Sequence, residues 1–176
     1  MILSMSTSPK SYVATAAELK ALAHPIRMRI LRLCLHESMT NKQLAEHLDL
    51  DPATSLHHVR TLARNGFLDA EPARTGNRGA LEKPYRATNK SWLLSIPRLD
   101  DRMTAVLAGL DAARDEIVAA GPDSLITNTR MGLRLSEAEI VELTERIQML
   151  VNEYADRPAT PDGIKVGFNT MLHRLA

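Results

Sequence analysis

The chain has 176 residues, of which 44% are hydrophobic and 24% are charged, so it can form one globular domain or one domain with an appended piece. The single cysteine, Cys34, excludes an intrachain disulfide and a cluster of thiolate ligands. No stretch has the roughly 18 consecutive apolar residues of a transmembrane helix, and the first residues lack the basic-then-apolar order of a secretory signal. We therefore expect a cytoplasmic protein with no membrane association.

Positive charge is concentrated in one part of the chain. Between Pro52 and Lys90 there are seven basic and three acidic residues, whereas the whole chain has a net charge of only +1. This segment carries a surplus of four positive charges, so the remainder has a net charge of −3. A basic segment on an otherwise acidic chain favours one surface that binds a polyanion.

Helix-start signals divide the first half of the chain. Two capping boxes begin at Thr15 and Thr40, each with a Glu or Gln three residues on, and Pro25 suits the first turn of a helix. Asp51 followed by Pro52 is a further start, and Gly66 is a typical helix terminator. These signals predict helices over residues 16–23, 41–48 and 52–65, and another that begins at Pro25 and places Ile26, Ile30, Leu33 and Cys34 on one face.

The helix over residues 52–65 has two distinct faces. We expect its inward face to hold Ser55, Val59 and Leu62. The opposite face collects Ala53, His57, Arg60, Thr61 and Arg64. Strands are predicted over 67–72 and 83–88, joined by a turn over 74–80 that is rich in Gly and Arg. The following segment, with Trp92, is expected to pack this hairpin onto the body.

A helix, a three-residue turn, a second helix and a basic hairpin follow one another in the order of a winged helix-turn-helix. A long helix is predicted over 99–120, with an apolar stripe of Met103, Val106, Leu107, Leu110 and Ile117. Alternating apolar residues predict strands at 131–135 and 164–170, on either side of a helix over 137–154 that Ser136 caps. Two strands alone are marginal, so this strand-helix-strand unit must pack on the long helix or on a second subunit.

The fold class predicted is therefore mainly α with small β. We expect a disordered lead over residues 1–12, a winged helix-turn-helix domain over 13–96, and a helical dimerisation or effector region with a β-α-β element over 97–176.

The runs LKALAHPIRMRILRLC, LAEHL, PATSLHHVRTLARNGFL and KPYRAT together resemble the ArsR-type winged-helix repressors. The resemblance covers roughly residues 18–88, and it implies a DNA-binding regulator whose recognition helix is 52–65 and whose wing is 67–88. It further implies that Ala53, Thr54, His57 and Arg60 approach the bases, with Thr61 on the same face. Arg64 would meet a phosphate, and the wing residues Arg74, Arg78 and Lys83 would meet the backbone or the minor groove.

The chain departs from that family in three respects. Leu56 stands where the family often has a serine, although a leucine could contact a thymine methyl. The paired cysteines of the metal-sensing members are missing, and the helix over 99–120 has no His or Cys ligands. The strand-helix-strand element is an addition. We therefore predict no metal site and no cofactor.

The histidines and the cysteine allow alternative interpretations. His57 and His58 are adjacent and point about 100° apart on a helix, so they are poorly placed to chelate one ion, and a DNA contact by one of them is favoured. His58 is expected to be a partly buried residue with a hydrogen bond, and His24 a cap or structural residue. Cys34 could sense redox state, but it lies on an apolar helix face where thiols are usually inert.

Three functions are compatible with these observations. The first is a homodimeric, sequence-specific transcriptional repressor that binds a pseudo-palindrome in double-stranded DNA, with or without a small-molecule effector. The second is a winged-helix module for protein–protein interaction that does not read DNA. The third is an enzyme that uses the winged helix to dimerise, which is disfavoured because the sequence has no catalytic motif.

Overall fold

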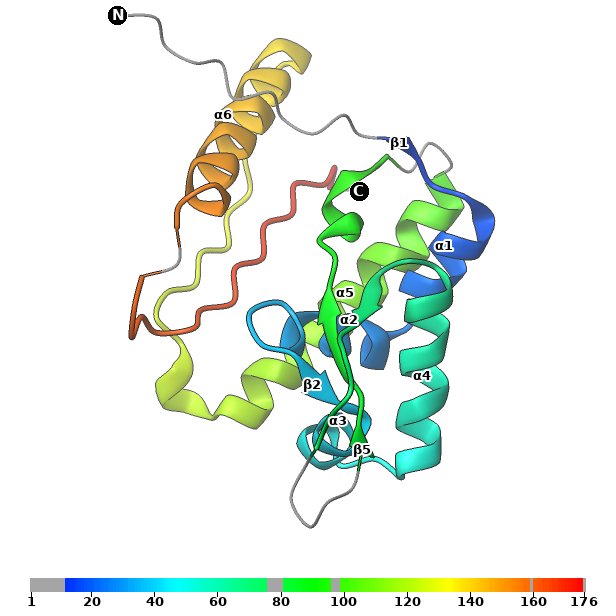
Figure 1. Ribbon diagram of the computed structural model, residues 1–176. Coiled ribbons are helices and arrows are strands. Elements are labelled where there is room, and N and C mark those ends of the chain that lie inside the picture. The colour runs from blue at the N-terminus through cyan, green and yellow to red at the C-terminus, as the bar shows by residue number, and fades with distance from the viewer. Residues whose placement is uncertain (1–11, 76–80, 96–98, 159, 176) are drawn as a thin grey trace, which may run out of the picture. The chain divides into compact units, whose positions relative to one another are not determined.

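The computed structural model describes residues 12–75, 81–95, 99–158 and 160–175 (Figure 1). Most of the predicted disordered lead, and the predicted wing tip over 76–80, lie outside these residues. Tyr12, the last residue of that lead, is in a short strand. The chain divides into two compact units, Met1–Pro122 and Asp123–Ala176. No helix among the described residues combines the length and the apolar character needed to cross a bilayer.

The helices of the first unit begin and end close to the predicted positions, because local signals fix their ends. They are α1 (Ala16–Leu22), α2 (Pro25–Leu33), α3 (Asn41–Leu48), α4 (Pro52–Arg64) and α5 (Leu99–Ala120). Thr15 and Thr40 cap α1 and α3 as complete capping boxes, as predicted. Gly66 has a φ of 71°, so it takes the left-handed conformation expected directly after α4.

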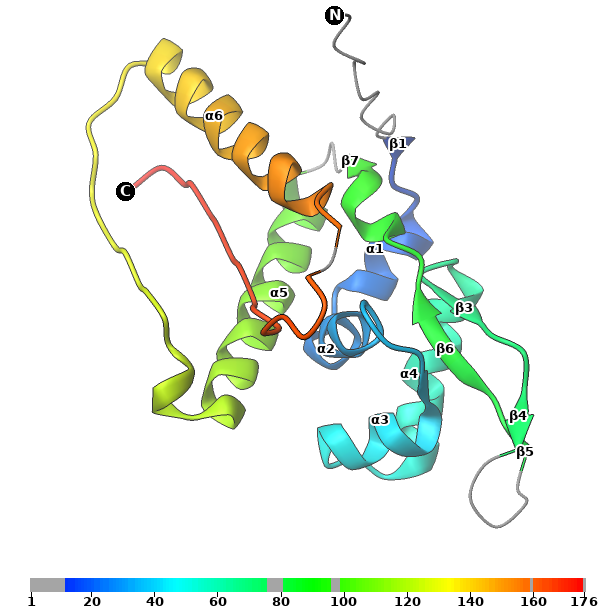
Figure 2. The same ribbon diagram turned by 60° about the vertical axis from the view of Figure 1, so that its left-hand side comes forward.

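The strands of the first unit are short. An antiparallel sheet in the order β2-β6-β3 combines β2 (Met39–Thr40), β6 (Pro84–Ala87) and β3 (Leu68–Ala70). The hairpin continues outward as β4 (Arg74–Thr75) paired with β5 (Leu81–Glu82), and these two strands lie at the end of the hairpin away from α4 in Figure 2. A separate parallel pair joins β1 (Tyr12–Val13) to β7 (Leu94–Ser95). Helices followed by this hairpin confirm the predicted winged helix-turn-helix.

One apolar core holds the first unit together. Its most deeply buried large side chains include Ile30 of α2, Leu44 of α3, Leu62 of α4 and Phe67 before β3. Every helix of the helix-turn-helix thus contributes to the same cluster, so α4 is fixed against α2 and α3. Trp92 does not join this core. It lies in the short 3-10 helix η2 (Lys90–Leu93) and is 60% exposed, so the predicted packing is wrong for Trp92 itself, although Leu94 of the same segment packs against the core.

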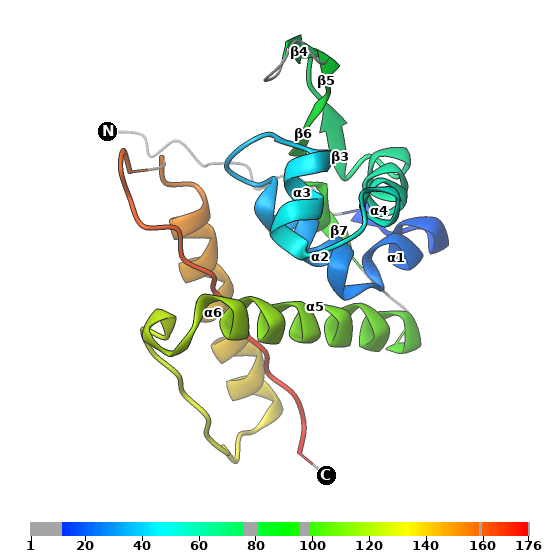
Figure 3. The same cartoon turned by 90° about the horizontal axis from the view of Figure 1, so that it is seen from below.

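Helix α5 packs against α2 and α1 (Figure 3). Ala108 and Ala112 are buried, and Glu116 lies 3.9 Å from Arg32 of α2 between Oε2 and Nε. Small residues allow two helices to approach closely. The predicted apolar stripe of α5 faces away from this contact, because all five of its members are exposed: Met103, Val106, Leu107, Leu110 and Ile117.

The second unit contains one long helix, α6 (Glu137–Ala155), which Ser136 caps as predicted. The short 3-10 helix η3 (Pro122–Ser124) lies at the boundary between the units. The predicted strands at 131–135 and 164–170 are wrong, because the structure assigns no strand to either segment. Alternation specifies an extended backbone, but a strand also needs a hydrogen-bonding partner, and neither segment is paired in a sheet within the described residues.

Candidate nucleic-acid interface

Helix α4 has one buried face and one exposed face. The buried face holds Ser55, His58, Val59 and Leu62. The exposed face holds Ala53, Thr54, His57, Arg60 and Arg64, with Thr61 half-buried at its edge. At about 100° per residue, the side chains at 53, 57, 60 and 64 fall within an arc of about 60°. The outward face expected from the sequence is therefore the one that α4 presents to solvent.

The turn between α3 and α4 is held by local hydrogen bonds. Asp49 ends α3 with a φ of 52°, a left-handed conformation that Asp tolerates better than most residues. The Oδ1 atom of Asp51 accepts a hydrogen bond from the backbone N–H of Ala53 at 2.8 Å, which caps α4. The side-chain amide of Asn41 donates to the backbone oxygen of Pro52 at 2.9 Å. These bonds fix where α4 begins relative to α3, and hence the orientation of its exposed face.

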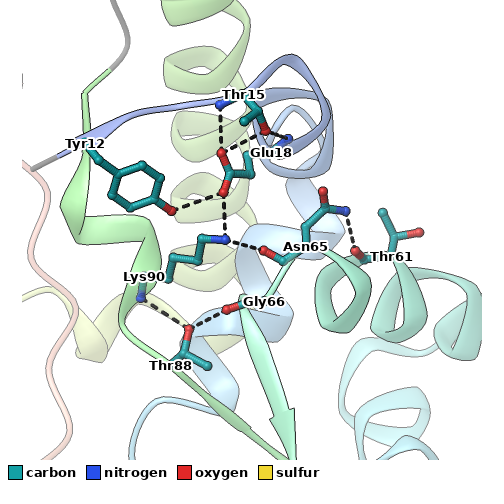
Figure 4. Close-up of polar contacts among 8 residues, drawn as sticks. All are labelled: Tyr12, Thr15, Glu18, Thr61, Asn65, Gly66, Thr88 and Lys90. Atoms are coloured by element: carbon teal, nitrogen blue, oxygen red, sulfur yellow. Dashed lines mark hydrogen bonds and ion pairs between the residues drawn. The ribbon is translucent and has the colours of Figure 1, made fainter.

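The C-terminal end of α4 is held by Lys90, which follows the wing (Figure 4). The Nζ atom of Lys90 donates to the backbone oxygen of Asn65 at 2.7 Å and lies 2.6 Å from Oε1 of Glu18 on α1. The Thr88 hydroxyl donates to the backbone oxygen of Gly66 at 2.8 Å. Carbonyl groups at a helix end need partners outside the helix. The segment after the wing supplies them and connects α4 to α1.

The Glu18 side chain is buried and has several hydrogen-bond donors. Besides Lys90, the hydroxyl of Tyr12 donates to Oε1 at 3.1 Å, and the backbone N–H of Thr15 donates to Oε2 at 2.7 Å. Lys90 makes the largest contribution, and together these donors lower the pKa of Glu18 from 4.5 to about 2 against the opposing effect of burial. Glu18 in turn raises the pKa of Lys90. Both groups are therefore charged at neutral pH.

The described part of the wing places two of the predicted basic residues on the surface. Arg74 lies opposite Glu82 in the β4–β5 pair, and it is exposed. Lys83, between β5 and β6, is exposed as well. The third predicted residue, Arg78, lies outside the described residues. Exposed cations on a projecting hairpin are free to contact phosphates.

Not all the basic residues of the 52–90 segment are available to a ligand. Arg86 donates through Nε to Oε1 of Glu71 at 2.9 Å and through Nη1 to the backbone oxygen of His36 at 3.1 Å. Lys90 is engaged with Glu18. By contrast, Arg60, Arg64 and Lys83 make no ion pair within the described residues. The positive charge left for a polyanion therefore lies on the exposed face of α4 and on the wing.

Behind the exposed face, His24, His58 and Arg27 lie close to His57, which is on that face. The rings of His24 and His58 are 4.6 Å apart between centroids, and those of His57 and His58 are 5.6 Å apart. His24 caps α2 by accepting from the backbone N–H of Ile26, as predicted. The expected hydrogen bond of His58 is absent at Nδ1, which is buried without a partner. Burial, with His24 and Arg27 nearby, lowers the pKa of His58 to about 4.

The remaining candidates for chemistry are inert in this structure. Cys34 is fully buried, and burial raises the pKa of its thiol to about 12, so it is protonated at neutral pH. Arg27 is buried and donates to the backbone oxygens of Ala21 and Lys20, which gives it a structural role at the end of α1. No three His, Cys, Asp or Glu side chains gather around a common point in the part of the chain that is described.

Sequence reasoning missed the role of Lys90 and Glu18. Glu18 was identified only as part of a capping box, and Lys90 only as one basic residue among seven. No local signal relates two residues that lie 72 positions apart in the chain. Their pairing depends on where the wing returns to the body, which is a property of the fold.

Comparison with known proteins gives one family match. Residues 22–71, which include α2, α3, α4 and β3, match the family described as a helix-turn-helix domain. No curated protein sequence matches the chain at a significant level.

Similar solved structures include three bacterial proteins. The transcriptional repressor BigR from Xylella fastidiosa is 16% identical, with 55% of this chain and 82% of that chain covered and a TM-score of 0.34. The transcriptional regulator Tm0710 from Thermotoga maritima is 12% identical, with 77% and 81% covered and a TM-score of 0.35. The YusO protein from Bacillus subtilis is 11% identical, with 77% and 79% covered and a TM-score of 0.37.

Proposed function

We propose that this chain is a sequence-specific transcriptional regulator of ArsR type that binds double-stranded DNA in the cytoplasm. One observation carries the proposal: α4 buries one face in the core and exposes Arg60 and Arg64 on the other, beside a wing with exposed Arg74 and Lys83. An α-helix presented in this way fits the major groove, and cations on a neighbouring hairpin fit the phosphate backbone.

Each predicted contact residue has a role in this proposal. Ala53, Thr54, His57 and Arg60 lie nearest the helix start and the middle of the exposed face, from which side chains reach base edges. Thr61 donates its hydroxyl to the backbone oxygen of His57 at 2.9 Å, so it lines the face without a free donor. The remaining basic residues, Arg64, Arg74, Arg78 and Lys83, would neutralise phosphates. No step in this function is catalytic.

We further propose that the protein acts as a homodimeric repressor. The exposed apolar stripe of α5, which includes Leu107 and Leu110, is unpartnered within the first unit, and apolar stripes of this kind commonly mark subunit interfaces. Two copies related by a two-fold axis would present two α4 helices to successive major grooves about 34 Å apart. Such a dimer would read a pseudo-palindrome. A small-molecule effector would act by binding the DNA-competent and DNA-incompetent dimers unequally.

The test is DNA binding by matched arginine variants. Fluorescence anisotropy should measure binding of the wild type, Arg60→Ala and Arg146→Ala to duplex DNA from upstream of the protein's own gene and to a scrambled duplex. Arg146 is a suitable control because it is an exposed helical arginine of the second unit. Arg60→Ala should weaken binding to the upstream duplex by about 1–3 kcal/mol, while Arg146→Ala should leave it unchanged. Equal affinity of the two variants would refute the assignment of α4.

The alternative is a winged-helix module that binds another protein. It is favoured if the wild type binds neither duplex at low salt. Its interaction would also depend weakly on salt, because no condensed counterions are released.

A further inference from the structure

The second unit lacks a core of its own. Among its described residues none is buried, and α6 has no buried residue at all. The apolar stripe of α6, which is Ile140, Leu143, Ile147 and Val151, is only half-buried. A segment of this size cannot bury enough apolar surface to be stable alone. Its apolar side chains therefore need a partner.

The two segments that flank α6 have the pattern of strands without the pairing of strands. Met131, Leu133 and Leu135 alternate in the first, and Ile164, Val166 and Phe168 alternate in the second. Neither is assigned to a sheet, and both are drawn as plain coil in Figures 1 and 2. Period-two alternation places one row of apolar side chains on a single face of each segment. The missing component is a neighbouring strand.

The exposed apolar surface of this unit has the size of a stable interface. Fourteen large apolar side chains among its described residues are 48% to 89% exposed. Complete burial of one such side chain corresponds to roughly 60–120 Å² of apolar surface. The unit therefore presents roughly 500–1,000 Å² of apolar surface, a range that includes the about 800 Å² that each partner buries in a standard protein interface.

The partner must supply backbone donors and acceptors as well as an apolar surface. A helix face such as that of α5 offers no hydrogen-bonding backbone edge. The strands of the first unit are only two to four residues long, shorter than either segment. A second copy of the chain brings segments of the same length with the same alternation. Around a two-fold axis a strand can pair with its own copy in antiparallel fashion.

We propose that the second unit is one half of a symmetric module. The segments 131–135 and 164–168 of two copies pair into one four-stranded sheet, and both α6 helices cover the apolar face of that sheet. This explains why a β-α-β pattern in the sequence leaves its strands unpaired in a single chain. The inference rests on the homodimer proposed above, and it gives that dimer a second contact that involves neither α5 nor the DNA-binding surface.

The test combines two matched variants of the full chain. Phe168→Asp places a charge on the alternating apolar face, whereas Asn169→Asp places the same charge on the opposite face of the same segment. Sedimentation velocity gives the concentrations at which each protein is a monomer or a dimer. Hydrogen–deuterium exchange of the full chain at those concentrations then measures the protection of the amides in 131–135 and 164–168.

We expect both segments to be protected in the dimer and to lose that protection in the monomer. Phe168→Asp should abolish the protection, Asn169→Asp should retain it, and the amides of α4 should remain protected in both variants as evidence that the first unit is folded. Protection that persists in the monomer would mean that the chain covers its own segments, and it would overturn the inference. So would a dimer whose segments exchange freely.

The readout separates this inference from the proposed function. If the dimer binds upstream DNA but its segments 131–135 and 164–168 are unprotected, the paired module is refuted and the proposed DNA-binding function stands. If these segments are protected in a dimer that binds no DNA, the paired module stands and the proposed DNA-binding function is refuted.

Discussion

Replacing Lys90 with Met should destabilise the first unit by about 2 kcal/mol at neutral pH. The pKa of Glu18 is lowered from 4.5 to about 2, with Lys90 as the largest cause. A difference of that size corresponds to roughly 3 kcal/mol of folding free energy. Tyr12 and Thr15 keep donating to Glu18 in the variant, so part of this stabilisation remains. The loss is substantial because the variant leaves a buried carboxylate without its cation.

The pH dependence of this effect has a definite direction. A carboxyl group whose pKa is lowered by folding stabilises the folded state at pH values above its unfolded pKa, here about 4.5. That stabilisation is lost as the pH falls towards about 2, because the unfolded chain then binds the proton more readily. In Lys90→Met the pKa of Glu18 should return towards 4.5. The variant should therefore lose less stability than the wild type between pH 5 and about 2.

Urea unfolding followed by circular dichroism at a series of pH values measures both quantities. Lys20→Met is a matched control, because Lys20 is an exposed lysine of α1. The role assigned to Lys90 would be refuted if Lys90→Met and Lys20→Met had unfolding free energies within about 0.5 kcal/mol of each other and parallel pH profiles.

The Lys90→Met variant should also discriminate less well between upstream and scrambled duplexes. The slope of log K against log salt should not change, since Lys90 contacts α4 and Glu18 rather than a phosphate.

Three further predictions follow from the geometry of α4 and its surroundings. The protein should become less stable as the pH falls from 6.5 towards 4, because folding lowers the pKa of His58 to about 4 and the unfolded chain binds the proton more readily. His58→Gln should make the unfolding free energy depend less on pH in this range, which an acid titration of that free energy measures. Gly66→Ala should lower the unfolding free energy by about 1–2 kcal/mol, because a φ of 71° is strained for alanine and the added Cβ would lie 3.3 Å from Nζ of Lys90. An unchanged midpoint of thermal unfolding would contradict this prediction. Leu62→Ala should lower the unfolding free energy by about 2–5 kcal/mol, because it leaves a cavity in the core. A loss of less than about 1 kcal/mol by calorimetry would show that α4 is not packed as described.

The ends of the helices could be predicted because the groups that determine them are close in sequence. Thr15, Thr40 and Ser136 each satisfy backbone donors within three residues, so the pattern alone locates α1, α3 and α6. The exposed face of α4 could be predicted for the same reason, since a period of 3.6 residues and a few apolar positions define which side is inward.

The contacts between distant segments could not be predicted. β2 is two residues long and has no alternation of its own, so its pairing with β6 depends on the surrounding core. The extended segments around α6 differ from β2 in that they alternate clearly in sequence but have no partner strand within the described part of the single chain. Their alternation was recognised, but it carries no information about which chain supplies the neighbouring strand. Trp92 was expected to pack the hairpin onto the body, yet it is exposed, and Lys90 of the same segment contacts α4 and α1 through polar groups.

The most direct test of the central claim is selection of binding sites from a pool of random DNA duplexes with the full-length protein. A dimer that reads DNA through α4 should enrich two inverted half-sites whose centres lie about one helical turn, or 10 base pairs, apart. Arg60→Ala should relax the selected sequence within each half-site. A pool that remains random after repeated rounds at low salt would contradict sequence-specific reading of DNA by this helix.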